Sequence, residues 1–177
     1  LDALDAWLDK LSEEKVNADA VAELRRTKPS LKIPIPDFPS DAWANLAQSV
    51  ALPNHATRPY SPRESGDGVH VPNATLKVPT GGGKTYLACA ALSRILGRYR
   101  QSNTGFVLWI VPNESIYSQT LRALRDRDHV YRQTLDRASA NRTMILEKTE
   151  TLRRADLDAN LCVMVLILQS SNRENKD

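Results

Sequence analysis

The chain has 177 residues, of which 41% are hydrophobic and 25% carry a charge, and its net charge is +3. That length suffices for one domain with a sizeable core, and the composition is typical of soluble globular proteins rather than disordered chains. The longest apolar run, Leu161 to Leu168, is too short to cross a bilayer. We therefore expect a cytoplasmic protein without membrane contact, in which Cys89 and Cys162 are reduced, buried thiols.

Charge is unevenly distributed along the chain. Residues 1–24 carry seven carboxylates and two lysines, whereas residues 94–154 carry eleven arginines and six carboxylates. An arginine-rich segment suits a polyanionic partner, although arginines on helices commonly form only a solvated face. Charge alone therefore leaves the partner open.

The first fifty residues have the pattern of helices. Leucines at positions 1, 4, 8 and 11 recur at three- and four-residue spacing, and residues 16–28 repeat such a pattern, which predicts two helices in a hairpin. Prolines at positions 29, 34, 36 and 39 predict an extended connector. Ser40 or Asp41 can cap a third helix over Ala42 to Val50. We assign residues 1–50 to an N-terminal helical extension.

A polar loop rich in proline, glycine and serine covers residues 54–73, and we treat residues 51–73 as a connector. Loops of this length are commonly functional. Tyr60 could stack on an adenine base, and Arg58 or Arg63 could contact it. Tyr60 and Arg58 are therefore candidate nucleotide-binding residues, with exposed loop residues that bind nothing as the alternative.

The strongest chemical signal is the stretch Thr80-Gly81-Gly82-Gly83-Lys84-Thr85, which lies between an apolar run, Ala74 to Val78, and a segment with helical periodicity. The apolar run predicts a strand. Glycines let consecutive N–H groups approach phosphate oxygens, and a helix start adds partial positive charge, so this order predicts a phosphate-binding loop. Lys84 would reach the β- and γ-phosphates of ATP, and the Thr85 hydroxyl would ligate Mg²⁺. These two are the candidate catalytic residues, and residues 80–85 are the cofactor-binding set.

Strands and helices alternate behind this loop. The pattern first predicts a helix with an apolar stripe from Leu87 to Leu96, which stops near residues 97–100, and a strand over Phe106 to Val111. A helix follows Pro112, capped by Asn113 or Ser115, and another covers His129 to Ala138. Two further strands are predicted at residues 143–146 and 161–168. Because Phe106 to Val111 is apolar throughout, we expect this strand to be buried on both faces of a parallel sheet. The alternation indicates a doubly wound α/β fold.

Three stretches resemble a known family. They are Val78 to Thr85, in which valine stands where the generic phosphate-loop pattern has its first glycine, Val107 to Ser115 followed by Gln119 and Thr120, and Cys162 to Arg173. Together they are similar to the first RecA-like domain of superfamily-2 helicases and translocases, closest to the Res subunit of type III restriction enzymes. The resemblance implies a RecA-like P-loop NTPase, a parallel sheet flanked by helices, over residues 74–177.

The chain departs from the family's pattern after Leu168. No Asp-Glu-x-His box, which handles Mg²⁺ and the attacking water in the family, follows that strand, and there is no second RecA-like domain with its arginine finger. The chain also begins at Leu1 without a methionine. We therefore expect an incomplete first RecA-like domain from a longer protein, which binds ATP but hydrolyses it poorly by itself.

The resemblance implies a DNA-dependent ATPase that uses ATP and Mg²⁺ in restriction or antiphage defence, with other subunits of such a complex as partners. Contacts to the DNA backbone, independent of base sequence, are expected from turns at the carboxyl ends of two strands, namely from Pro112, Asn113, Ser115, Gln169, Asn172 and Arg173. Two alternatives stay open. One is a small P-loop kinase or phosphotransferase, and the other is a nucleotide-dependent protein-interaction module whose acidic N-terminal helices dock on a partner.

Overall fold

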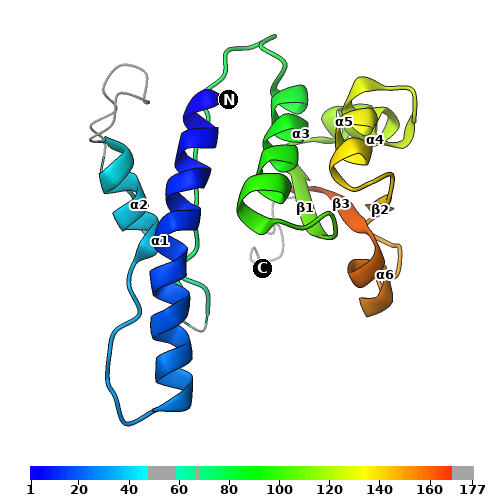
Figure 1. Ribbon diagram of the computed structural model, residues 1–177. Helices are drawn as coiled ribbons and strands as arrows, with labels where there is room; N and C mark the ends of the chain where they lie inside the picture. Colours follow the sequence, from blue (N-terminus) through cyan, green and yellow to red (C-terminus); the bar gives the residue numbers. More distant parts are fainter. Residues whose placement is uncertain (48–58, 67, 169–177) are drawn as a thin grey trace, which may run out of the picture. The chain divides into compact units, whose positions relative to one another are not determined.

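The computed structural model describes residues 1–47, 59–66 and 68–168. The chain divides into two compact units, Leu1–Pro79 and Thr80–Asp177 (Figure 1). The first unit holds two helices and an extended segment, and the second holds the sheet and the remaining helices. Each unit is described by itself below.

The first unit is built on one long helix, α1 (Asp2–Thr27), with α2 (Phe38–Ala47) packed against it. The predicted hairpin is wrong, because α1 continues through the position where two helices were expected. No proline or glycine interrupts residues 2–27, so nothing in the backbone ends the helix there. Val16 is 67% exposed and Leu24 is 37% exposed. The second half of α1 therefore keeps large apolar side chains in solvent.

The second helix starts earlier than predicted. α2 begins at Phe38, because the Asp37 carboxylate accepts hydrogen bonds from the Ser40 N–H (3.2 Å) and the Ser40 hydroxyl (2.6 Å) and so caps the first turn. Phe38 and Leu46 are buried. The predicted end of this helix at Val50 lies outside the described residues.

The segment that follows, residues 59–66 and 68–79, contains one antiparallel bridge, Glu64 with His70, and otherwise neither helix nor strand. The strand predicted at Ala74 to Val78 is therefore wrong, since these residues join no sheet in the part of the chain that the structure describes. Leu76 is 51% exposed. A strand needs a neighbouring edge that pairs with its backbone N–H and C=O groups, and apolar character alone does not supply that edge.

The second unit contains a three-stranded parallel sheet in the order β1-β3-β2, flanked by helices (Figure 1). Its elements are, in chain order, α3 (Lys84–Arg94), the π-helical turn η1 (Ile95–Arg100), β1 (Gly105–Val111), α4 (Glu114–Arg125), α5 (Val130–Ala138), β2 (Thr143–Glu147), α6 (Arg154–Ala159) and β3 (Leu161–Ile167). The predicted strands and helices of this unit are confirmed. The helix α6 was not predicted, because six residues are too few to show a helical period.

The core of this unit lies between the sheet and the helices α3, α4 and α5. Side chains from all three helices meet the central strand β3 there, and they are buried: Cys89, Leu96, Leu121, Leu124, Leu135, Leu161, Val163 and Val165. Because α3 and α4 both pack into this core, the first residues of the two helices belong to the same packed unit.

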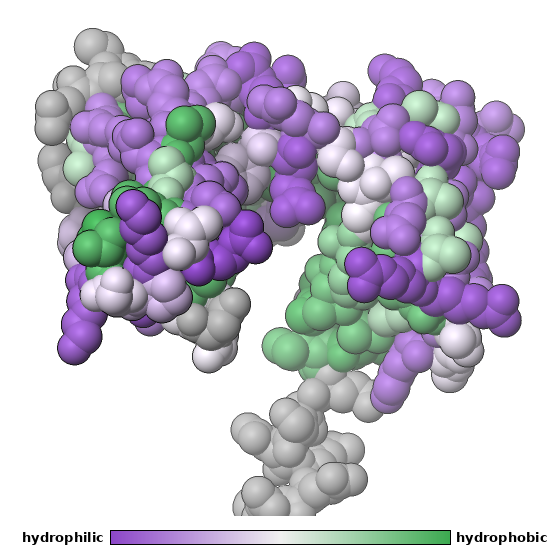
Figure 2. All heavy atoms as spheres, turned by 60° about the horizontal axis from the view of Figure 1, so that its bottom comes forward, coloured by the Kyte–Doolittle hydropathy of each residue, from purple (hydrophilic) through white to green (hydrophobic). Residues whose placement is uncertain are grey.

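The strand β1 is half-buried, and the prediction that both its faces are covered is wrong for the described residues. Val107 and Trp109 pack against the core. Phe106, Leu108 and Ile110 point to the opposite face and are 47%, 48% and 51% exposed. Figure 2 shows the resulting hydrophobic area on the surface of the sheet-containing unit. An apolar run therefore did not distinguish a strand covered on two faces from one covered on a single face.

Candidate functional site

The predicted phosphate loop forms a tight turn that ends at the first residue of a helix. Thr80 to Gly82 make a turn, and α3 begins at Lys84 with Gly83 as its N-cap. Gly81 and Gly83 have φ values of +79° and +69°, a conformation that residues with a Cβ adopt at a cost. A Cβ at either position would meet no atom within 4 Å. Backbone conformation, not crowding, therefore requires glycine there, and the space over the loop is open.

The start of α3 suits an anion. Gly83 offers no side chain to cap the helix, and the first turn holds no acidic residue. The leading N–H groups of a helix have no acceptor within the helix and carry partial positive charge. Lys84, the first helical residue, is exposed, and Thr85, the second, is half-buried. The loop is therefore a candidate site for phosphate groups, and Thr85 is the candidate metal ligand beside it.

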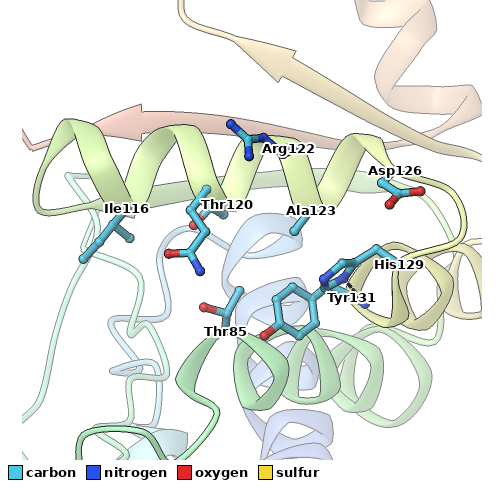
Figure 3. Close-up of a pocket in the computed structure, with 9 residues that line it drawn as sticks. Thr85, Ile116, Thr120, Arg122, Ala123, Asp126, His129 and Tyr131 are labelled. Atoms are coloured by element: carbon cyan, nitrogen blue, oxygen red, sulfur yellow. Dashed lines mark hydrogen bonds between the residues drawn. The ribbon is translucent and has the colours of Figure 1, made fainter.

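A pocket of about 240 Å³ lies next to this loop, between the start of α3, one face of α4 and the start of α5 (Figure 3). It is lined by Thr85, Ile116, Gln119, Thr120, Arg122, Ala123, Asp126, His129 and Tyr131. Figure 3 shows Thr85 and Tyr131 across the pocket from Thr120 and Ala123. The structure thus brings the metal-binding candidate of the phosphate loop close to the helix that follows β1.

The sequence placed Gln119 and Thr120 in a stretch that resembles the family, but it assigned no pocket to the residues of α4 and α5. A signal was present on α4, because Ile116, Gln119, Thr120 and Ala123 recur at three- and four-residue spacing and so share one helix face. No such signal joins that face to α5, since only the packing of α4 against α5 brings the two together.

The aromatic side of the pocket is held in place by the cap of α5. The Tyr131 N–H donates to Nδ1 of His129 (3.2 Å), and the two rings meet edge to face with their centroids 4.3 Å apart. Tyr86 of α3 lies 6.4 Å from Tyr131, centroid to centroid. These contacts fix the Tyr131 ring beside Thr85.

The second predicted site, the turn after β1, is also a helix start. The Asn113 side-chain oxygen accepts a hydrogen bond from the Ile116 N–H (3.0 Å), so Asn113 is the cap of α4, one of the two caps predicted. Pro112 and Ser115 flank it and are exposed. These residues lie at the carboxyl end of a parallel strand, where open α/β sheets place their ligands.

The sheet side of α4 is anchored to β2. Arg125 pairs with Glu147 at 2.5 Å, and the Tyr117 hydroxyl donates to the same carboxylate at 3.3 Å. Burial and the Glu147 charge raise the pKa of Tyr117, so this hydroxyl stays a donor. On its other side, α4 borders the pocket.

Of the two predicted adenine contacts, the structure describes only Tyr60. Tyr60 belongs to the first unit, where its hydroxyl accepts hydrogen bonds from the backbone N–H and the Nδ2 of Asn73, each at 2.9 Å. Its ring lies 6.3 Å from that of Trp43, and burial raises the pKa of Tyr60. Both the hydroxyl and the ring of Tyr60 therefore have partners within the first unit. Arg58, like Gln169, Asn172 and Arg173, lies outside the described residues.

Two further properties bear on ligands and location. Within residues 1–47, 59–66 and 68–168, no three histidine, cysteine or acidic side chains gather closely enough to hold a metal ion. None of the described helices combines the length and the apolar character that a membrane crossing requires.

Comparison with known proteins gives a family. The family model described as type III restriction enzyme, res subunit, matches residues 39–176. No curated protein and no solved structure matches the chain. The family is an N-terminal domain of superfamily-2 helicases with a RecA-like fold, and the three-stranded parallel sheet flanked by helices agrees with that fold. Such domains are helicase-type ATPase regions that generally use ATP and Mg²⁺ and engage DNA. The chain belongs to the family of type III restriction enzyme res subunits.

Proposed function

We propose that this chain is the ATP-binding N-terminal part of a DNA-dependent ATPase, a helicase or translocase that acts in restriction or antiphage defence. The observation that carries the proposal is the start of α3, where two glycines in left-handed conformation lead into Lys84 and Thr85 at an uncapped helix end. The family match favours this function over a small P-loop kinase.

In this proposal, different residues of the loop contact different parts of ATP. The N–H groups of residues 81–85 donate hydrogen bonds to the phosphate oxygens, and the Lys84 ammonium neutralises the β- and γ-phosphates. The Thr85 hydroxyl holds Mg²⁺, which when bound offsets further phosphate charge. Hydrolysis also needs a carboxylate that positions water and an arginine that stabilises the transferring group. We assign those groups to other parts of the complete motor, so the chain alone binds ATP and turns it over slowly.

DNA contact is proposed at the turn after β1. Pro112, Asn113 and Ser115 are exposed at the carboxyl end of that strand, and small polar side chains with backbone N–H groups bind phosphates without reading bases. Gln169, Asn172 and Arg173, which lie outside the described residues, are proposed as further contacts. Binding of this kind weakens with salt, so affinity for duplexes of unrelated sequence should fall together between low and physiological ionic strength.

The test is nucleotide binding by Lys84→Ala beside a matched control, Lys148→Ala, which removes an exposed lysine of the same unit. A hydrogen bond to a charged group contributes about 1.5 to 3 kcal/mol, so Lys84→Ala should weaken ATP binding about 10- to 150-fold. Titration of a fluorescent ATP analogue measures this. Equal affinities of the two variants for ATP would contradict the proposal. Rapid steady-state ATP hydrolysis by the wild-type chain would contradict the assignment of the water-positioning carboxylate and the arginine to other parts of the motor.

A further inference from the structure

An exposed tyrosine stands directly after the two residues that the phosphate loop contributes to α3. Tyr86 is the third residue of that helix and is 47% exposed. Among the tyrosines, tryptophans and phenylalanines of the described residues, only Phe106 is also exposed, and it lies at the amino end of β1. Open α/β sheets bind their ligands at the carboxyl ends of the strands. Tyr86, and not Phe106, is therefore the exposed ring at the candidate site.

The geometry of a helix directs the Tyr86 side chain toward the phosphate loop. Cα–Cβ bonds in an α-helix tilt toward the N-terminus, so a side chain in the first turn covers the space beside the helix start. Tyr86 lies two residues after Lys84, which is about 3 Å along the helix axis. It is turned by about 100° around that axis from Thr85. The tyrosine ring and the candidate metal ligand therefore face different sides of the helix start.

The Tyr86 ring belongs to a row of three rings. Its centroid lies 6.4 Å from that of Tyr131 on α5, and the two ring planes are inclined at 34°. The Tyr131 ring in turn meets the His129 ring edge to face at 4.3 Å. The helices that carry these rings, α3 and α5, pack against each other. A side chain that already has a packed neighbour loses less conformational freedom when a ligand binds it, so Tyr86 is well placed to accept one.

A nucleobase is the ligand that suits this position. The phosphates of a nucleotide bound by the loop would lie at the leading N–H groups of α3, and the ribose joins them to a base. A base has a flat aromatic face, which stacks on a tyrosine ring. The predicted base contact, Tyr60, has Trp43 and Asn73 as partners within the first unit. Tyr86 offers the sheet-containing unit an exposed ring of its own.

We propose that the Tyr86 ring stacks on the base of the nucleotide whose phosphates the loop binds. The inference rests on the proposed function and adds a base-binding residue to it. Stacking uses the face of a base and not its hydrogen-bonding edge. Tyr86 therefore contributes affinity for a nucleotide rather than a choice between bases.

The test compares a ligand that has a base with one that has none. The full 177-residue chain and its variants would be titrated by calorimetry with ATP and with inorganic tripolyphosphate, each in the presence of Mg²⁺. Tyr86→Leu removes the ring and keeps an apolar residue that favours a helix. It should weaken ATP binding about 5- to 150-fold and leave tripolyphosphate binding unchanged. Tyr86→Phe keeps the ring and should recover most of the affinity for ATP that Tyr86→Leu loses.

Two further variants are the controls. Tyr99→Leu makes the same chemical change in η1, which continues α3 at the end far from the phosphate loop, and it should bind both ligands as the wild type does. Lys84→Ala should weaken both ligands, because its effect acts through the phosphates that they share.

The outcomes separate the inference from the function on which it rests. Wild-type affinity for ATP in Tyr86→Leu would overturn the inference, and so would an equal loss of ATP affinity in Tyr99→Leu. An equal loss of ATP and tripolyphosphate affinity in Tyr86→Leu would also overturn it, since Tyr86 would then support the loop and not a base. A wild-type chain that binds tripolyphosphate as tightly as ATP would overturn the inference while the phosphate loop keeps its assigned role. A wild-type chain that binds neither ligand would refute the proposed function itself.

Discussion

Replacing Arg132 with methionine should destabilise the sheet-containing unit by about 3 to 5 kcal/mol, the usual cost of breaking a buried ion pair. Arg132 is 6% exposed and its guanidinium makes three hydrogen bonds: Nε donates to Asp136 (2.9 Å), Nη1 to the Leu124 carbonyl (3.2 Å) and Nη2 to the Thr143 carbonyl (2.9 Å). The side chain therefore ties α5 to the end of α4 and the start of β2. Its loss leaves a carboxylate and two carbonyls without their donor.

The matched control is Arg125→Met on the neighbouring helix. Arg125 pairs with Glu147 at 2.5 Å, but the two side chains are 46% and 35% exposed. Water screens such a pair, and exposed ion pairs contribute about 0 to 1 kcal/mol. The same chemical change should thus cost several times less at position 125 than at position 132.

The measurement is unfolding in urea, followed by hydrogen exchange of the peptides that cover β2 and β3, so that the sheet-containing unit alone is observed. The change in the free energy of unfolding is compared between the two variants and the wild type. If Arg132→Met costs no more than Arg125→Met, burial does not strengthen the Arg132 contacts, and the reasoning from exposure is refuted.

Two further predictions concern the phosphate loop and a buried thiol. Gly83→Ala should lower the free energy of unfolding by about 1 to 2 kcal/mol, because φ is +69° there. Gly97→Ala, at a position without positive φ or close neighbours, should leave stability unchanged or raise it. Urea denaturation of both variants measures the two effects, and equal effects would contradict this prediction. Burial raises the pKa of Cys89 to about 12, so the folded chain holds this proton above the pH at which an exposed thiol loses it. Stability from this group is therefore complete below about pH 8.5 and declines as the pH rises toward 12. Titration of native Cys89 with a thiol reagent at pH 8 should be slow until the chain is unfolded, and fast labelling of the native chain would argue against this burial.

Several features could be read from the sequence because they depend on neighbouring residues. Three glycines followed by Lys84 and Thr85 indicate a turn into a helix, and the structure has that turn. Asn113 was a predicted cap because its side chain can reach the N–H three residues on. The strands and helices from residue 84 to residue 168, except α6, were predicted from the spacing of their apolar residues and from the local signals at their ends. The family match agrees with the resemblance that these motifs carried.

Other features depend on partners far along the chain, and the sequence could not reveal them. Ala74 to Val78 has the composition of a strand but meets no edge in the described structure, and β1 has an apolar outer face that the described helices leave half-exposed. Arg132 was indistinguishable in the sequence from the solvated arginines around it, because its acceptors at Leu124 and Thr143 come from other elements.

The pocket is the plainest case of this division. By itself, the sequence determined which residues form the phosphate loop and which form one face of α4, since local spacing decides both. Only the tertiary structure decided that Thr85, Gln119 and Tyr131 line one cavity, because the packing of α3, α4 and α5 on the sheet brings together residues up to 46 positions apart (131 − 85).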